Sequence, residues 1–381
     1  MRLGVNVVRL TRNYTGVGRY IDCLLREWSR VKLPFEEVVL YTHSPLSDQR
    51  VSFPLDRFRV VVTGPRVPDP VWEWWALPGQ ARRCDVLFCP SYTLPLGYRG
   101  ASAVAHFGPS SEPPGSLAWW RFRAYDLLYH YSVRRADQVF TAASWVKERL
   151  RTVYGVPSHK IDVIPLAASE EFVPATPERI REWRQRYGLG EQPYALFVGK
   201  LVGRHHILEM LEAFSQARAR HGFVHRLVLV GPNPNRLDLS RHVRRLGIEA
   251  VVSHVPYMPA PDLPLAYSGA EVFIYPSAAA EGFGIPLLEA MACGTPAIGT
   301  RLGSVPEVVG DAAWLLDANS VEELAGGLAR LLLDAPLRQQ LRARGLDRAR
   351  SFSWRRTAGE TMAILERLAR SSAASFVRSG R

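Results

Sequence analysis

The sequence is poor in cysteine, with four among its 381 residues: Cys23, Cys84, Cys89 and Cys293. They are too few and too scattered for a disulfide framework. Cys84 and Cys89 are five positions apart, which is not the usual spacing of zinc ligands. We therefore expect all four thiols to be reduced and structural, as in a cytosolic protein.

Long apolar stretches are also lacking. No run of about 18 apolar residues is present, so we expect no membrane-spanning helix. The first ten residues, MRLGVNVVRL, have no uninterrupted apolar segment and no small-residue cleavage site, so we expect a first strand rather than a signal peptide. Hydrophobic residues make up 47% and charged residues 22% of the chain, which excludes a mostly disordered protein. We expect a cytoplasmic enzyme or binding protein.

Acidic residues are fewer than basic ones, and the formal net charge is +12. A basic surface suits anionic partners such as nucleotide phosphates, nucleic acid or anionic lipid. Nucleic acid is not an expected partner, because the basic residues are spread out and no nucleic-acid-binding module is recognisable. The run Trp119–Tyr131 mixes aromatic residues with arginine. It predicts either a helix in a membrane interface, and so peripheral contact with the inner membrane face, or a core-facing helix with a wet arginine side.

Short β-branched, apolar runs alternate with helical patterns in two series. Strands that alternate with helices predict parallel sheets covered on both faces. A polar stretch with proline near residues 168–192 separates the series. The sequence therefore predicts an α/β protein of two doubly wound domains, residues 1–167 and 168–356, with ligands bound at the carboxyl ends of the strands, in a cleft that the domains face. The expected strands are 3–10, 38–42, 59–63, 86–90, 102–107, 138–142, 161–165, 194–198, 226–230, 251–256, 272–276, 296–299 and 313–316.

The segment Glu281-Gly-Phe-Gly-Ile-Pro-Leu-Leu-Glu289 follows an expected strand and opens a helical run. Its two glycines let backbone N–H groups approach a ligand, and Pro286 suits a first helical turn. A helix N-terminus favours a phosphate or another anion. Two carboxylates beside exposed amides suit a sugar nucleotide, because its hydroxyls can donate to the carboxylates and its phosphates can accept from the amides. The alternative is a helix start with two solvated glutamates.

This segment resembles the E-x7-E signature of the retaining family 4 glycosyltransferases, which are group 1 enzymes of the GT-B fold. Other stretches resemble that family in the same order along most of the chain. They are Trp72-Glu-Trp-Trp-Ala-Leu-Pro78, 85–95, Val104-Ala-His106, Thr141-Ala-Ala-Ser-Trp145, Val163-Ile-Pro-Leu166, Leu196-Phe-Val-Gly-Lys200, Gly294-Thr-Pro296 and Gly303-Ser-Val-Pro-Glu307. The resemblance implies two Rossmann-like domains, of which the N-terminal one binds the acceptor and the C-terminal one the nucleotide sugar. It also implies that a last helix, about 357–381, packs back on the N-terminal domain.

The resemblance implies roles for individual residues. Glu281 would contact hydroxyls of the donor sugar, and Glu289 would bind the ribose hydroxyls. The backbone of Phe283, Gly284 and Ile285 would face the sugar and the diphosphate. Gly16 and Gly18 would let the loop after the first strand approach the diphosphate. A dinucleotide fingerprint is the competing interpretation there, but Ile21 stands where it needs glycine.

Two further positions carry an expected function. His106 follows an apolar strand and enters a loop rich in glycine, proline and serine; the resemblance makes it a donor-sugar contact or a group that places the acceptor, whereas a structural histidine is the alternative. The family usually places Arg and Lys side by side at the diphosphate, and this chain has Arg204 followed by His205. Arg204 fits, since a guanidinium binds phosphate in two places. His205 would replace the lysine only when protonated, with Lys200 as a further candidate.

The resemblance implies retaining transfer of a hexose, with mannose from a GDP donor slightly favoured over a UDP-sugar, to a saccharide or lipid-linked acceptor in bacterial polysaccharide or O-antigen assembly. We expect front-face transfer in which Glu281, His106 and Arg204 are the catalytic set, because no carboxylate is obviously a nucleophile. No Asp-x-Asp pair stands in a suitable loop, so we expect neither a metal nor another cofactor. The alternatives are a sugar-nucleotide-binding scaffold without turnover, a nicotinamide oxidoreductase, and a GT-B epimerase or phosphorylase.

Overall fold

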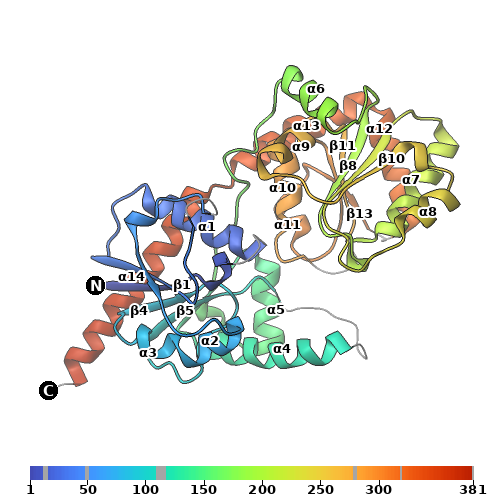
Figure 1. The fold of residues 1–381 in the computed structure, drawn as a ribbon. Helices are drawn as coiled ribbons and strands as arrows, with labels where there is room; N and C mark the ends of the chain where they lie inside the picture. Colours follow the sequence, from blue (N-terminus) through green and yellow to red (C-terminus); the bar gives the residue numbers. More distant parts are fainter. Residues whose placement is uncertain (12–15, 48–50, 109–116, 278–280, 318–319, 380–381) are drawn as a thin grey trace. The chain divides into compact units, whose positions relative to one another are not determined.

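The computed structural model describes residues 1–11, 16–47, 51–108, 117–277, 281–317 and 320–379. The chain forms two compact units. The first comprises Met1–Leu166 together with Trp354–Arg381, and the second comprises Ala167–Ser353. Each unit is a parallel sheet with helices on both sides (Figure 1).

The sheet of the first unit has the strand order β3-β2-β1-β4-β5-β6-β7, and all its pairings are parallel. The order reverses at β1, so the carboxyl ends of β1 and β4 flank a topological switch point. Its strands are β1 (Arg2–Asn6), β2 (Glu37–Thr42), β3 (Arg59–Val62), β4 (Val86–Cys89), β5 (Ala101–Ala105), β6 (Gln138–Thr141) and β7 (Ile161–Val163).

The last helix of the chain belongs to the first unit. Helix α14 (Trp354–Ser379) packs against α1 (Gly16–Ser29) and against β4 and β5. The Trp28 indole donates to the Ala358 carbonyl at 3.0 Å, and the Thr357 hydroxyl donates to the Pro165 carbonyl at 2.6 Å. The helix begins three residues before the expected 357, at Trp354, whose ring is buried beside Tyr20. The helices of this unit are α1 (Gly16–Ser29), α2 (Asp69–Trp75), α3 (Leu77–Ala81), α4 (Leu117–Arg135), α5 (Ser144–Tyr154) and α14 (Trp354–Ser379).

The sheet of the second unit has the order β10-β9-β8-β11-β12-β13 and is also parallel throughout. Its strands are β8 (Tyr194–Val198), β9 (Arg226–Val230), β10 (Val252–Val255), β11 (Val272–Tyr275), β12 (Ala297–Thr300) and β13 (Trp314–Leu316). Its α-helices are α6 (Pro177–Arg186), α7 (Ile207–His221), α8 (Leu239–Arg245), α9 (Leu263–Ser268), α10 (Ile285–Ala292), α11 (Val305–Val309), α12 (Val321–Leu333) and α13 (Ala335–Arg350).

Every expected strand is present, with ends that shift by a few residues. The largest difference is at β1, which ends at Asn6 because the chain then turns into a short 3-10 helix, η1 (Val8–Thr11). Buried aromatic and aliphatic side chains fill both cores, as the alternating pattern predicts. The prediction of two doubly wound α/β domains is confirmed.

Two glycines allow the ends of β8 and β9 to pass each other closely. Gly231 has φ +135°, and a Cβ there would lie 2.1 Å from the carbonyl oxygen of Gly199. The Gly199 amide donates to the Val230 carbonyl at 2.9 Å, which ties the two strand ends together. This contact fixes where the segment after β8 leaves the sheet, and that segment carries Lys200, Arg204 and His205.

Candidate functional site

The turn between β11 and α10 is built by Gly284 and Pro286. Gly284 stands in the left-handed region with φ +87°, immediately before the helix, where other residues are strained. Pro286 lies in the first turn of α10, as the sequence predicts. The Phe283 ring is buried against Phe352, so the loop before the helix is anchored by an apolar contact. The backbone at Gly284 and Ile285 therefore lies at the carboxyl end of β11, where ligands of such sheets bind.

Glu281 is held firmly in this turn, with 9% of its surface exposed. Its carbonyl accepts hydrogen bonds from the amide and the hydroxyl of Ser304, at 3.2 and 2.7 Å. Its Oε1 accepts from the Ser277 hydroxyl at 3.1 Å. A carboxylate fixed from both ends is already oriented before a ligand arrives, which is what precise recognition of hydroxyls needs.

Glu289 lies one turn inside α10 and is buried. The Tyr267 hydroxyl donates to its Oε2 at 3.1 Å. Tyr267 lies in α9 and is itself fully buried. The structure thus places both carboxylates of the motif in the second unit, each oriented by a hydroxyl donor.

The segment after β8 brings positive charge and a buried imidazole to the same place. Lys200 and Arg204 are exposed, whereas His205 is 3% exposed at the end of the 3-10 helix η4 (Gly203–His205). The His205 Nε2 atom lies 3.8 Å from Glu281 Oε1. The structure therefore brings His205 and Glu281 together, and Arg204 precedes His205 on the same segment. Burial lowers the pKa of His205, and the nearby Arg204 and Lys200 charges lower it further, against the opposing influence of the Lys200 carbonyl and Glu281.

His106 lies in the other unit, directly after β5. Its ring is fully buried and edge-on to the rings of Tyr92, Tyr129 and Tyr154, with centroids 4.8, 5.5 and 5.7 Å away. The Gly108 amide donates to Nδ1 at 3.2 Å, so the neutral ring carries its proton on Nε2. Within the described part of the chain this Nε2 has no hydrogen-bond partner. His106 thus presents a buried N–H donor at a carboxyl strand end.

Burial lowers the pKa of His106 to about 3 from its ordinary 6.5. The unfolded chain therefore binds the proton first, and folded-state stability is lost as the pH falls from about 6.5 towards 3. Asparagine does not titrate in this range, and its amide oxygen can still accept from the Gly108 amide. We therefore expect the His106→Asn variant not to show this pH-dependent loss of stability. Between pH 6.5 and 4.5 the free energy of unfolding of the wild type should fall faster than that of the variant, by up to about 1.4 kcal/mol per pH unit. Urea unfolding at three pH values checks this, and parallel curves would contradict it.

Gly16 and Gly18 lie in the first turn of α1 rather than in a loop. Neither is held in a left-handed conformation. A Cβ at Gly16 would meet open space, and one at Gly18 would make only an ordinary contact with the Arg9 carbonyl. A diphosphate that approaches these glycines would therefore meet the start of helix α1.

A buried polar network in the first unit was missed by sequence reasoning. Glu73 of α2 is 1% exposed and accepts from the Asn6 amide at 3.0 Å and the Thr93 hydroxyl at 2.6 Å. Burial raises its pKa against the opposing effect of these donors. Nearby, the buried Asp69 accepts from Arg9 and from His43, both at 3.1 Å. The signal was present, because Asn6 is a polar residue at the end of an apolar strand and Glu73 interrupts a run of tryptophans.

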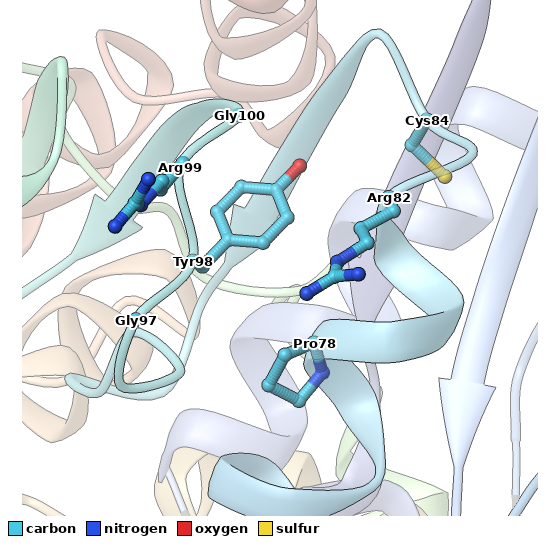
Figure 2. A pocket seen from close by; sticks show the side chains of 7 residues that line it. All are labelled: Pro78, Arg82, Cys84, Gly97, Tyr98, Arg99 and Gly100. Atoms are coloured by element: carbon cyan, nitrogen blue, oxygen red, sulfur yellow. The ribbon is translucent and has the colours of Figure 1, made fainter.

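A separate cavity of about 420 Å³ lies at the amino ends of β4 and β5. Arg82 and Arg99 stand on either side of Tyr98 there, above Pro78 (Figure 2). Tyr98 is buried and its hydroxyl donates to the Ala81 carbonyl at 3.4 Å. This is the sheet edge opposite to the carboxyl ends that carry the predicted residues, and no sequence motif pointed to it.

The described residues contain neither a helix suited to crossing a membrane nor a cluster suited to holding a metal ion. None of their helices is both long and apolar enough to cross a membrane. No group of three or more His, Cys, Asp or Glu side chains among them is placed to hold a metal ion.

Comparison with known families matches both units. Residues 2–167 match the glycosyl transferase 4-like domain, and residues 179–348 match the glycosyl transferases group 1. The chain is 29% identical over 365 residues to the O-antigen chain mannosyltransferase B of Escherichia coli, covering 91% of this chain and 95% of that protein. It is 30% identical over 207 residues to a GDP-mannose-dependent α-(1-6)-phosphatidylinositol monomannoside mannosyltransferase of Mycolicibacterium smegmatis, covering 52% of this chain and 54% of that protein.

Solved structures show the same fold. WaaG, a glycosyltransferase involved in lipopolysaccharide biosynthesis, matches with a TM-score of 0.76 at 16% identity, over 96% of this chain and 99% of that one. HepE of Anabaena, solved in complex with UDP and glucose, matches with a TM-score of 0.75 at 15% identity over the same shares. The fold is GT-B, as the sequence predicts. The chain therefore belongs to the group 1 glycosyltransferases, and it is a hexosyl-transferring enzyme of the GT-B fold.

Proposed function

We propose that the protein transfers mannose from GDP-mannose, with retention of configuration, to a saccharide or lipid-linked saccharide in O-antigen or other polysaccharide assembly. The observation that carries the proposal is the site in the second unit. There the carboxylate of Glu281, fixed by Ser277, lies 3.8 Å from His205 Nε2, on the segment that also carries the exposed cations Lys200 and Arg204. The choice of mannose and GDP rests on the names of the relatives reported above.

The leaving group of this reaction is a nucleoside diphosphate. Its developing negative charge would be stabilised by Arg204, by Lys200 and by the amides at the start of α10. Glu281 would bind hydroxyls of the sugar and stabilise the oxocarbenium-like charge that forms when the bond breaks. Glu289 would hold the ribose. The departing phosphate would accept the proton of the attacking hydroxyl, and the reaction would require no metal.

The acceptor would be bound by the first unit. His106 offers there an Nε2–H that has no partner among the described residues, and a neutral donor of this kind suits a saccharide hydroxyl or ring oxygen. We propose that the enzyme works in the cytoplasm and contacts the inner membrane face when its acceptor is lipid-linked.

Thermal stabilisation by nucleotides tests the donor site. We expect GDP and GDP-mannose at about 100 times their dissociation constants to stabilise the protein by roughly 2.7 kcal/mol, which raises the melting temperature by several degrees. UDP, ADP, their hexose conjugates and NAD should have smaller effects. Arg204→Ala should reduce the GDP shift, whereas Arg220→Ala, an exposed arginine of α7 outside the site, should leave it unchanged. If only UDP-sugars raise the melting temperature, the donor base is uridine and not guanosine. If no nucleotide raises it, the proposal is overturned.

A further inference from the structure

The hydrogen bond on one side of His205 fixes the state of its ring. Nδ1 lies 2.7 Å from the carbonyl oxygen of Lys200. A carbonyl has no proton to give, so Nδ1–H is the donor. The ring is also packed between Phe197 and Tyr275, each with its centroid 5.7 Å away. The orientation of His205 is therefore set by its own backbone segment and by the core.

The other ring nitrogen, Nε2, carries a lone pair that accepts no hydrogen bond from the part of the chain that the structure describes. Among the described residues Nε2 has no hydrogen-bond partner, although the side chain is 4% exposed. It is turned toward Glu281 Oε1 at 3.8 Å. That oxygen is also an acceptor, and it already receives the Ser277 hydroxyl. Two acceptors thus face each other with no hydrogen between them, and leaving a buried acceptor unsatisfied is costly.

Protonation of His205 does not resolve this arrangement. The groups that face it are Lys200 and Arg204 on its own segment, Glu281 before α10 and Tyr275 on β11. Burial outweighs the favourable effect of Glu281 and lowers the pKa of the ring, and the two cations act in the same direction. A charged imidazolium–carboxylate pair would also close to about 2.7–2.9 Å. The ring is therefore neutral, and it does not replace the positive charge of a lysine at the diphosphate.

We propose that His205 Nε2 and Glu281 Oε1 act as paired acceptors that read two neighbouring hydroxyls of the donor hexose, so that His205 determines sugar specificity and does not hold phosphate. This inference rests on the proposed function of the same site. One hydroxyl has a single proton and satisfies one acceptor, so two acceptors call for two hydroxyls. Hydroxyls on adjacent carbons of a pyranose present two such donors side by side. A donor sugar that lacks the hydroxyl at His205 Nε2 leaves that buried acceptor unpaired, whereas Glu281 Oε1 keeps the Ser277 hydroxyl.

The test is a double-mutant cycle that combines substitution of His205 with removal of single hydroxyls from the donor sugar, and it measures binding affinity. GDP-mannose and its analogues deoxygenated singly at C2, C3, C4 or C6 are titrated against the wild type and His205→Asn, with GDP as the reference ligand. Asparagine keeps an amide N–H for the Lys200 carbonyl but has no acceptor at the Nε2 position. We expect the wild type to bind one of these analogues at least about tenfold more weakly than GDP-mannose. His205→Asn should bind GDP-mannose more weakly by the same factor, bind that analogue without further loss, and bind GDP as the wild type does.

Three further variants separate this role from others. His205→Gln can place an amide oxygen near the Nε2 position and should restore part of the coupling. His205→Lys should weaken GDP-mannose binding if the histidine is an acceptor, whereas a phosphate role predicts equal or tighter binding of GDP. His206→Asn is the matched control, because His206 has φ +47°, which asparagine tolerates, and its ring pairs with Glu209 at 3.3 Å.

The outcomes distinguish the two claims. If the wild type binds GDP-mannose but His205→Asn shows no coupling to any hydroxyl, the inference is wrong and the proposed donor stands. If His205→Asn weakens GDP and GDP-mannose equally, His205 holds the diphosphate and the inference is again wrong. If the wild type binds no sugar nucleotide, the proposed function fails and takes the inference with it.

Discussion

Replacing Glu281 by glutamine is expected to lower the turnover number by about 100-fold or more, equivalent to about 2.7 kcal/mol of transition-state stabilisation, while the melting temperature stays equal or rises. The amide oxygen of glutamine can still accept from Ser277. In the other orientation of the amide, the nitrogen takes the Oε1 position, gives up the hydrogen bond from Ser277 and can donate to His205 Nε2 across the 3.8 Å gap. The two side chains would then satisfy each other instead of the sugar, and the negative charge that faces the forming oxocarbenium ion would be lost.

The measurement is GDP release from GDP-mannose in the presence of acceptor, with a thermal melt of each protein. Glu209→Gln serves as the control, because Glu209 is a half-exposed residue of α7 that pairs with His206, and its activity should remain near that of the wild type. An active Glu281→Gln enzyme, within about threefold of the wild type in turnover number, would remove Glu281 from the mechanism, since a transition-state contact is worth far more than that.

The Gly231→Ala variant is expected to lose at least about 3 kcal/mol of stability in the second unit. Two independent costs add there. The backbone has φ +135°, and the new methyl group would lie 2.1 Å from the Gly199 carbonyl oxygen. Backbone cannot move aside as a flexible side chain can, so β8 and β9 would have to separate at their ends. Because that contact sets the course of the segment that carries Arg204 and His205, GDP binding should weaken as well.

A second glycine isolates the steric cost. Gly222 has φ +64°, and a Cβ there would meet nothing within 4 Å, so Gly222→Ala carries backbone strain alone and should cost about 1–2 kcal/mol. Thermal or urea unfolding of both variants gives the comparison. Equal losses at the two positions would show that the close approach of β8 and β9 is not a determinant of stability.

The fold was predictable because its determinants are local in the sequence. Each β-branched run, such as 194–198 and 226–230, is a strand of the structure. The turn at Gly284 and Pro286 follows from the conformational limits of those two residues. The structure also brings together Glu281, Arg204 and His205, because parallel strands bring their carboxyl ends to one edge of a sheet. Arg204 and His205 were named from the family resemblance, and the order of strands and helices along the chain places them at the same sheet edge as Glu281.

Other parts of the site depend on contacts between distant residues, which no local pattern reports. The tautomer of His205 depends on a carbonyl five residues away, and its unpaired nitrogen depends on Glu281, 76 positions later. The buried carboxyl of Glu73 in α2 receives donors from Asn6, at the end of β1, and from Thr93, in the segment between β4 and β5. The sequence therefore left open whether His205 carries charge, whereas in the structure burial lowers the pKa of the ring.

The most direct test of the central claim is the fate of GDP-mannose with mannose-terminated oligosaccharide acceptors. Retaining transfer predicts that one GDP is released for each mannosyl unit transferred and that the new linkage is α, read from the one-bond carbon–proton coupling at the product's anomeric carbon by NMR. A β-linked product would contradict retention. A protein that binds GDP-mannose and releases no GDP with any acceptor of the panel would contradict the claim of transfer from this donor.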